Sequence, residues 1–556
     1  MSAAPYRRRL AATLTWLLLI SFSIALGPSA ISAAPAKNVI VLIADGCSSE
    51  QHTFARWFKG APLSYDPYQV GAVKTFIADS VIADSAPAAT AFAAGVRTSD
   101  RFISVGPRAD VLSTLPRPPE ELRYRPLATV LEGAKLLKKA TGIVATSRVT
   151  HATPAAYVAH TEDDIMEQLV HQGVDVVFGG GKRHLLPKEA GGRRTDGEDL
   201  LARLVNWGYQ VVENREELMR LRAGRVFGLF AASHMDPEID RPRSNPGQPS
   251  LEEMTRKAIE ILAQDEEGFF LMVEGSQIDW ACHASDPAHL LSDLLAFDRA
   301  VAAALDFARA DGRTLVLIMS DHNTGGFSIG GRATAAIYTQ LSVEAFLEPF
   351  RKMRASAYAM WARLGPEKTV PRLQSVLRDG WGLDITEPEA RAILDRAAAN
   401  KSEGYAAIGA ILCPIYTHVG WTTHGHTGGD VPLFAFGPGA PGGVLDAPQI
   451  AHVCADALGL DLARLNARLF VEASDAFPES RVALDATDPA NPLVVIEVRG
   501  RRAELSVNKN LLTVGERMVS LEGVVVHAAK TGRIYLPMQA VQIIQGRTPV
   551  LPAVAK

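Results

Sequence analysis

From residue 37 onward, short apolar segments alternate with longer segments in which apolar positions recur at helical spacing. Each apolar segment is rich in Val, Ile, Leu or Phe and ends in glycine or polar residues, which is typical of a strand buried on both faces. The clearest examples are NVIVLIADG (38–46), ATGIVATSRVTH (140–151), VDVVFGGG (174–181), GFFLMVEGSQ (268–277) and RTLVLIMSDH (313–322). The alternation predicts an α/β fold with a mostly parallel central sheet and helices on both faces. In such a sheet we expect the chemistry at the carboxyl ends of the strands.

One long segment interrupts this alternation. Residues 327–420 contain helical stretches such as SVEAFLEPFRKMRASAYAMWARLG and few strands, and sheet-like sequence resumes at VPLFAFGPG (431–439). We therefore expect a catalytic domain formed by residues 35–326 and 421–470, with residues 327–420 as a helical insertion within it. A stretch rich in proline and arginine at 106–126 is expected to form a surface loop.

The pattern changes again near the C-terminus. Residues 479–493 resemble a linker, and the strand-like segments and turn signals that follow predict a small β-rich module at residues 487–556. The module contains no cluster of catalytic residue types. It faintly resembles the small N-terminal module of copper amine oxidases, and this resemblance implies packing or adhesion at most.

The N-terminus has the pattern of an export signal. Three arginines at 7–9 precede the apolar run LAATLTWLLLISFSIALG, and the small residues SAISAA follow. We expect a signal peptide over residues 1–34, cleaved near Ala33 to Ala36, and hence a periplasmic or secreted protein. The alternative is an uncleaved anchor, in which case the retained segment would contact the membrane. No later stretch is long and apolar enough to span a bilayer.

Composition narrows the class of protein further. A chain of 556 residues that is 47% hydrophobic and 21% charged is globular and too long for one ordinary domain. The formal net charge of −4 gives no reason to expect nucleic acid binding. The four cysteines are too few for a disulfide framework, and their pairing cannot be read from the sequence: they are Cys47, Cys282, Cys413 and Cys454.

Carboxylates and imidazoles gather just beyond the predicted strands. They are Asp45, His151, Glu274, Asp279, His283, Asp321, His322 and His426, with Thr153 beside them. One such residue alone is usually a helix cap or a structural histidine. So many at one sheet edge would repel each other or need costly desolvation unless cations bind them. Mixed Asp and His sets suit zinc, whereas carboxylate and hydroxyl sets suit magnesium.

The stretch IADSAPAATAFAAG (82–95) places Ser85 at the same edge. It predicts a helix that begins at Asp84 or Ser85, with Pro87 in its first turn. Taken alone, Ser85 is best interpreted as an N-cap residue. However, a helix N-terminus also presents free amides and a partial positive charge, which suit a phosphate group. Asp79 and Ser80 form a similar pair, but no clear helix start follows them.

Six motifs together resemble the metal-dependent alkaline phosphatases. They are VIVLIADG, DSAPAATAFAAG, TSRVTHATPAAYVAH, VEGSQIDWACH, SDHNTGGF and HTGGDVPLFAFGP, they occur in the family's order, and they cover roughly residues 37–330 and 420–440. The resemblance implies an alkaline phosphatase-like fold and hydrolysis of small phosphate monoesters. It also implies Ser85 as the nucleophile that forms a phosphoserine intermediate.

The resemblance further implies two Zn2+ ions and one Mg2+ ion. Asp279, His283 and His426 correspond to the first zinc site, and His424 is a weaker candidate than His426 because HTGGDVP carries the match. The second zinc site would be formed by Asp45, Asp321 and His322. The magnesium site would be formed by Asp45, Thr153 and Glu274, with His151 as an outer-shell residue.

The sequence departs from the family at the phosphate-binding arginine. Many members have an arginine soon after the ATPAA…AH segment, where this chain reads AHTEDDIMEQL. Either another cation reaches the phosphate, with the arginine-rich stretch at 107–125 as a source, or the pocket works with less positive charge. We expect weaker inhibition by phosphate than in relatives that have the arginine, since a bidentate arginine is a strong phosphate ligand.

Other functions remain open at the level of sequence. The same scaffold could act on phosphodiesters, phosphonates or sulfate esters, and a non-catalytic surface-binding relative could keep the fold. No motif has lost a predicted metal ligand or the serine, which favours an enzyme. The sequence allows a homodimer but does not decide the oligomeric state.

The thiols of Cys47 and Cys282, close to predicted ligands, are expected to be packed as small hydrophobic groups.

Overall fold

The centre of the fold is a ten-stranded sheet. The computed structural model describes residues 35–161, 164–331, 334–399 and 404–556, so the predicted signal peptide lies outside the described residues. The strand order is β14-β2-β13-β8-β1-β7-β3-β4-β6-β5. These strands are β1 (Asn38–Ala44), β2 (Gln69–Lys74), β3 (Ala140–Arg148), β4 (Val176–Gly180), β5 (Gln210–Val212), β6 (Val226–Leu229), β7 (Phe269–Gly275), β8 (Thr314–Met319), β13 (Val431–Phe436) and β14 (Gly443–Asp446).

The pairing within this sheet is parallel except around β13. Strand β1 pairs in parallel with both β7 and β8, and β3 continues the parallel arrangement beside β7. Strand β13 runs antiparallel to both of its neighbours, β2 and β8. The predicted α/β class with a mostly parallel sheet is confirmed. The single antiparallel strand was not predicted.

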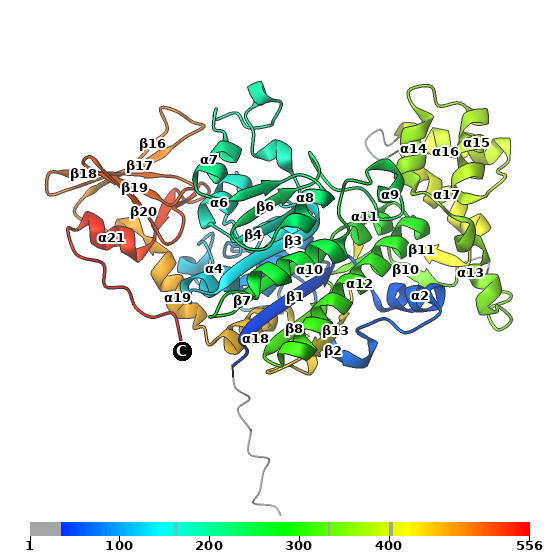
Figure 1. The fold of residues 1–556 in the computed structure, drawn as a ribbon, viewed down its shortest axis with the longest axis horizontal. Helices are drawn as coiled ribbons and strands as arrows, with labels where there is room; N and C mark the ends of the chain where they lie inside the picture. Colours follow the sequence, from blue (N-terminus) through cyan, green and yellow to red (C-terminus); the bar gives the residue numbers. More distant parts are fainter. Residues whose placement is uncertain (1–34, 162–163, 332–333, 400–403) are drawn as a thin grey trace, which may run out of the picture. The chain divides into compact units, whose positions relative to one another are not determined.

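The fully apolar strands arise because the sheet is covered on both faces. Alternate residues of β1 enter different cores: Ile40 and Leu42 belong to one apolar cluster, and Val39 and Val41 belong to the other. Helices on the first face include α2 (Ser49–Lys59), α10 (Leu251–Leu262), α11 (Gln277–His283) and α12 (Pro287–Asp311). The second face carries α3 (Ser85–Ala94), α4 (Val130–Leu136), α6 (Ile165–Gln172), α7 (Leu200–Asn206) and α18 (Ala447–Leu458). In Figure 1, α10 and α12 lie in front of the sheet.

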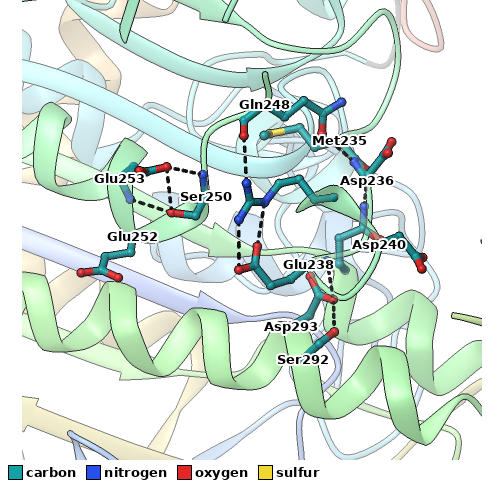
Figure 2. Close-up of polar contacts among 12 residues, drawn as sticks. Met235, Asp236, Glu238, Asp240, Gln248, Ser250, Glu252, Glu253, Ser292 and Asp293 are labelled. Atoms are coloured by element: carbon teal, nitrogen blue, oxygen red, sulfur yellow. Dashed lines mark hydrogen bonds and ion pairs between the residues drawn. The ribbon is translucent and has the colours of Figure 1, made fainter. Parts of the chain in front are cut away.

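The segment that leads from β6 into α10 is fixed by polar contacts (Figure 2). The backbone amide of Glu238 donates to Asp293 of α12 over 3.0 Å, and Arg241 forms an ion pair with Glu238. Ser250 caps α10 by accepting a hydrogen bond from the amide of Glu253 over 3.2 Å. The short helix α9 (Arg241–Ser244) lies within this segment, whereas α8 (Arg215–Arg220) precedes β6. The contacts join the loop to α12 and thereby to the helix-covered face.

The helical insertion begins and ends at neighbouring positions. Strand β10 (Phe327–Ile329) pairs antiparallel with β11 (Val419–Trp421), so the two ends of the insertion are held together. Between them lie α13 (Val343–Lys352), α14 (Ala357–Leu364), α15 (Val370–Trp381), α16 (Glu387–Ala399) and α17 (Ala406–Tyr416). The fully buried Trp381 and the nearly buried Phe346 give these helices an apolar interior. The chain can therefore carry the insertion without opening the central sheet.

The C-terminal region consists of two small antiparallel sheets. One contains β16 (Arg481–Asp485), β17 (Leu493–Val498), β18 (Arg501–Ser506), β19 (Leu511–Val514) and β20 (Arg517–Ser520), in that order. The other contains β15 (Val471–Glu472), β22 (Arg533–Leu536) and β21 (Val526–Ala528), accompanied by α19 (Leu462–Leu469), α20 (Ala473–Ala476) and α21 (Met538–Ile544). The expected linker at 479–493 instead contains β16, because this half-exposed edge strand has too weak an apolar pattern to be recognised.

The C-terminal module is joined to the main domain by polar contacts. Lys509 forms an ion pair with Glu167 over 3.1 Å, and His171 of α6 is hydrogen-bonded to Asn510 over 2.8 Å. Among the residues that the structure describes, no helix is both long enough and apolar enough to cross a membrane.

Candidate active site

The predicted site residues gather where four neighbouring strands end. Asp45 directly follows β1, and Glu274 lies one residue before the end of β7. The parallel register pairs Ile43 of β1 with Glu274, and Ala145 of β3 with the same residue. Asp321 and His322 follow β8 closely. The parallel strands thus bring side chains that are far apart in sequence to one buried edge.

Asp45, Asp321 and His322 form the first group, here called the inner cluster. Their ligand atoms all lie within 4.8 Å of one another, and all three residues are fully buried. Both carboxylate oxygens of Asp45 and Oδ2 of Asp321 lack a hydrogen-bond partner. Burial, followed by the charge of Asp321, raises the pKa of Asp45 well above its ordinary value. Oδ1 of Asp321 accepts hydrogen bonds from the amides of Gly46 and His322 over 3.1 and 3.0 Å. The three buried carboxylate oxygens that remain without donors fit a bound cation, which would supply the missing positive charge.

Asp279, His283 and His426 form the second group, the outer cluster. Asp279 and His283 are four residues apart on α11, and His283 Nε2 lies 3.2 Å from Asp279 Oδ2. Nε2 of His426 lies 3.1 Å from Nε2 of His283 and 3.6 Å from Oδ1 of Asp279. Burial alone would raise the pKa of Asp279, but His283, His322 and His426 hold it well below its usual range. Facing imidazole nitrogens beside a carboxylate are a donor set that suits zinc.

The two histidines considered for the first zinc site, His424 and His426, have different contacts in the structure. The imidazole of His424 is hydrogen-bonded through Nε2 to Arg396 over 2.8 Å and through Nδ1 to the carbonyl of His283 over 3.0 Å. His426 instead stacks on His322 with ring centroids 3.8 Å apart. His426 is thus the residue that joins the two clusters, and the ring of His424 is engaged elsewhere.

Thr153 and Glu274 lie beside Asp45 as a third group. Thr153 Oγ1 and Glu274 Oε1 are buried without hydrogen-bond partners, as are the oxygens of Asp45. Burial is the largest influence on Glu274 and raises its pKa to about 7. An all-oxygen set of two carboxylates and a hydroxyl fits magnesium. The ring of His151, predicted as an outer-shell residue, packs against Trp280 and His234 with centroid distances of 5.3 and 5.5 Å.

Ser85 is the first residue of α3 and is 5% exposed. Its Oγ lies 3.0 Å from Nε2 of His322, so the hydroxyl contacts the inner cluster directly. The preceding Asp84 occupies the N-cap position without a side-chain capping bond, and its carbonyl accepts from the amide of Ala88. No acidic residue lies within the first turn, so the carboxylate of the N-cap residue Asp84 is the acidic group next to the partial positive charge of this helix end.

Two residues that the sequence did not single out position these groups. Thr324 Oγ1 donates to Asp279 Oδ1 over 2.6 Å and lies 3.3 Å from Nδ1 of His322, so it touches both clusters. Gly46 has φ +70°, and a Cβ there would lie 2.6 Å from Thr324 Oγ1 and 2.7 Å from Asp279 Oδ1. Both residues occur within recognised motifs, SDHNTGGF and VIVLIADG, but spacing alone gave them no role.

A cleft of about 610 Å³ opens beside the outer cluster. Its walls include Asp84, His283 and His426, together with Ile82, Asp79 and Arg108. The earlier Asp79-Ser80 pair precedes no helix, and Asp79 accepts a hydrogen bond from Arg108 over 2.7 Å. The cleft thus reaches the two histidines of the outer cluster, and its volume is sufficient for a small substrate.

The two thiols near the clusters are inert by position. Cys47 and Cys282 are both fully buried and unpaired. Burial raises the pKa of both thiols, which keeps them protonated. Gln51 contacts the sulfur of Cys282 over 2.9 Å. Their packing agrees with the expectation of small hydrophobic groups.

A mostly parallel sheet that carries a buried serine and two Asp/His clusters at one edge defines an α/β enzyme with a candidate metal centre. The alkaline phosphatase family model matches residues 36–460. The chain therefore belongs to the alkaline phosphatase family, and this relationship identifies it as a phosphomonoesterase. Residues 461–556 lie outside the matched region.

Individual relatives agree with this placement. Alkaline phosphatase 3 of Bacillus subtilis is 35% identical over 440 residues, which cover 75% of this chain and 87% of that protein. Streptomycin-6-phosphate phosphatase of Streptomyces griseus is 35% identical over 346 residues, which cover 52% of this chain and 74% of that protein. The crystal structure of Thermus thermophilus alkaline phosphatase has a TM-score of 0.68 at 29% identity and covers 79% of this chain and 95% of its own.

Proposed function

We propose that this protein hydrolyses small phosphate monoesters through a phosphoserine intermediate on Ser85, in a site that holds two zinc ions and one magnesium ion. The observation that carries the proposal is the position of Ser85 Oγ, 3.0 Å from His322 and at the N-terminus of a buried helix. A hydroxyl in that place can attack a phosphorus atom that enters through the cleft.

The donor sets fit the proposed metals. The inner and outer clusters would each hold one zinc ion, and Asp45, Thr153 and Glu274 would hold magnesium. A solved mutant of the alkaline phosphatase from the Antarctic bacterium TAB5, 26% identical with a TM-score of 0.53, contains magnesium in its M3 site, which supports a magnesium site in this fold. When bound, the metals would lower the pKa of coordinated oxygens and stabilise negative charge on the transferred phosphoryl group.

The chain's own residues would carry out the two displacement steps. Ser85 Oγ loses its proton and attacks phosphorus, so that a bond forms to the serine oxygen and the bond to the alcohol oxygen breaks. The alcohol leaves with a proton. Water then attacks the phosphoserine, releases inorganic phosphate and returns the proton to Ser85. The free amides at the start of α3 would stabilise the charge on the phosphoryl oxygens throughout.

Esters that share one leaving group provide the test. We expect 4-nitrophenyl phosphate to be hydrolysed far faster than bis(4-nitrophenyl) phosphate or 4-nitrophenyl sulfate at alkaline pH. Ser85→Ala should lose nearly all turnover while metal analysis still finds about two zinc ions and one magnesium ion. Faster cleavage of the diester or the sulfate would assign the protein to the related ester hydrolases. Full activity of Ser85→Ala would refute the nucleophile assignment.

We also propose that the mature protein acts in the periplasm or outside the cell. The basic, apolar and small-residue pattern of residues 1–34 supports export. The N-terminal residue of the protein recovered from the cell exterior tests this, and a start near Ala33 to Ala36 is expected. An intact N-terminus on membrane-bound protein would instead indicate a retained anchor.

A further inference from the structure

Arg108 is placed to contact the substrate in the cleft. The residue comes from the 106–126 stretch, and it lines the same cleft as His283, His426 and Asp84. Among the described residues that line this cleft, Arg108 is the sole lysine or arginine. The other basic candidate, Arg148, lines a different cavity and is hydrogen-bonded to His234 over 3.0 Å.

Three contacts hold the guanidinium group of Arg108 in place. Nη1 donates to Asp79 over 2.7 Å, Nη2 donates to the carbonyl of Asp100 over 3.0 Å, and the guanidinium carbon lies 4.3 Å above the centre of the Phe102 ring. An immobilised arginine binds an oxyanion at a lower entropic cost than a free side chain.

The guanidinium keeps donor capacity for a ligand. Arginine has five N–H donors, and its side-chain hydrogen bonds to described residues use two of them. The side chain is 38% exposed, so the cleft can reach it. A phosphate oxyanion is the ligand whose geometry best suits a guanidinium fork.

We propose that Arg108 binds the phosphate group of the substrate as it enters this cleft, and the inorganic phosphate product as it leaves. The role falls to Arg108 because, among the described residues that line the cleft with His283 and His426, it alone carries a permanent positive charge. The inference rests on the proposed function of monoester hydrolysis. The carboxylate of Asp79 positions the guanidinium of Arg108, but it also offsets part of the positive charge that would attract phosphate.

Because Asp79 offsets the charge of Arg108, substitutions at these two residues should change the inhibition constant for phosphate in opposite directions. Arg108→Ala should raise both KM and the inhibition constant for inorganic phosphate by about 10-fold or more, because a charge-assisted contact is lost. Asp79→Asn keeps an oxygen acceptor but removes the opposing charge, so it should lower the phosphate inhibition constant. Arg108→Lys should restore part of the affinity, since lysine provides the charge without the fork. In all three variants kcat should change less than KM.

Arg101 is the matched control, because its side chain is 79% exposed and pairs weakly with Asp100 over 3.8 Å. Arg101→Ala should leave the phosphate inhibition constant within about 2-fold, as expected of an exposed pair. The proposal is overturned if folded, metal-loaded Arg108→Ala keeps the native inhibition constant. It is also overturned if Arg108→Ala and Asp79→Asn shift that constant in the same direction, since a purely structural ion pair would do so.

Direct titration of inorganic phosphate into the metal-loaded protein keeps this test separate from the proposed function. If the native protein hydrolysed no monoester, the proposed function would fall, whereas the binding comparison between native protein and Arg108→Ala would still decide the role of Arg108. If monoester turnover were present and depended on Ser85, unchanged phosphate binding in Arg108→Ala would overturn this inference alone.

Discussion

Thr324 donates a hydrogen bond of 2.6 Å to Asp279, and the same hydroxyl lies 3.3 Å from the ring of His322. A single side chain therefore sets the orientation of one residue in each cluster. Residues that orient metal ligands typically change metal affinity by 10-fold to 100-fold when they are removed.

Thr324→Val is expected to weaken metal retention. The substitution keeps the shape of the side chain but removes the donor to Asp279, so the carboxylate becomes free to rotate. We expect zinc affinity to fall by about 10-fold or more, with a parallel loss of activity at limiting zinc. Competition with a chelator measures the affinity, and Thr324→Ser, which keeps the hydroxyl, is the control. Equal zinc affinity in the valine variant and the native protein would contradict the orienting role.

His426→Ala and His424→Ala should differ sharply. His426 faces Asp279 and His283, so its loss should remove one zinc ion per chain and reduce kcat/KM by at least about 100-fold. His424 is engaged with Arg396 and the backbone of His283, so its substitution should leave the zinc content unchanged. Metal analysis of both purified variants decides between them. The reverse pattern would assign the ligand to His424.

Gly46→Ala should disturb the site through contact rather than through strain. Its backbone has φ +70°, and the new Cβ would collide with Thr324 and Asp279. Gly60 has φ +69°, and no atom beyond its own chain neighbours lies within 4 Å of the place that a Cβ would occupy, so Gly60→Ala carries similar strain without the collision. Both variants should lose stability by about 1 kcal/mol from the left-handed backbone. Only Gly46→Ala should also lose zinc and activity, as measured by thermal unfolding with metal analysis.

His171 should contribute to acid sensitivity away from the metal centre. Burial, assisted by the nearby Arg203, lowers the pKa of His171 to about 3, although the hydrogen bond to Asn510 opposes the shift. The unfolded chain therefore takes up a proton near pH 6.5 that the folded chain refuses, and the free energy of unfolding falls as pH drops below that value. Between pH 7 and pH 5 this one group should cost about 2 kcal/mol.

Denaturant unfolding of His171→Gln at both pH values checks this contribution. The variant should lose less stability than the native protein on going from pH 7 to pH 5, even if it is less stable at both. His452→Gln, at an exposed position, is the control. An unchanged pH dependence in the His171 variant would show that the folded protein accepts the proton.

The sequence allowed most of the fold to be predicted because the central strands are buried on both faces. Strands β1, β7 and β8 each contain a continuous apolar run, which is typical of a sheet covered by helices on both faces. Strand β2 was missed because its burial is mixed along its length, and so was β16 at the sheet edge. The direction of β13 could not be inferred, since an apolar run such as VPLFAF does not encode its orientation.

Some residues of the site could likewise be predicted from the sequence, and others could not. Asp279 and His283 could be paired from their spacing on one helix, and Asp45 and Asp321 from their positions after strands. Thr324 and Gly46 could not be assigned, because each contacts atoms that approach from distant segments. For Arg108 the sequence indicated only the stretch 107–125 as a source of a cation, and the contacts with Asp79 and Phe102 that fix its side chain beside the cleft could not be predicted.

The outer cluster joins residues 143 positions apart, His283 and His426, across the whole helical insertion. A chain that has been synthesised past His322 but not as far as His426 therefore contains Ser85 and the inner cluster but lacks one residue of the outer cluster. The late strand β13 must also insert between β2 and β8 after these have been synthesised. Closing so long a loop is slow compared with forming local contacts. The outer cluster thus cannot form before residue 426 of the 556 has been made, which delays the complete site until well after the serine and the inner cluster are present.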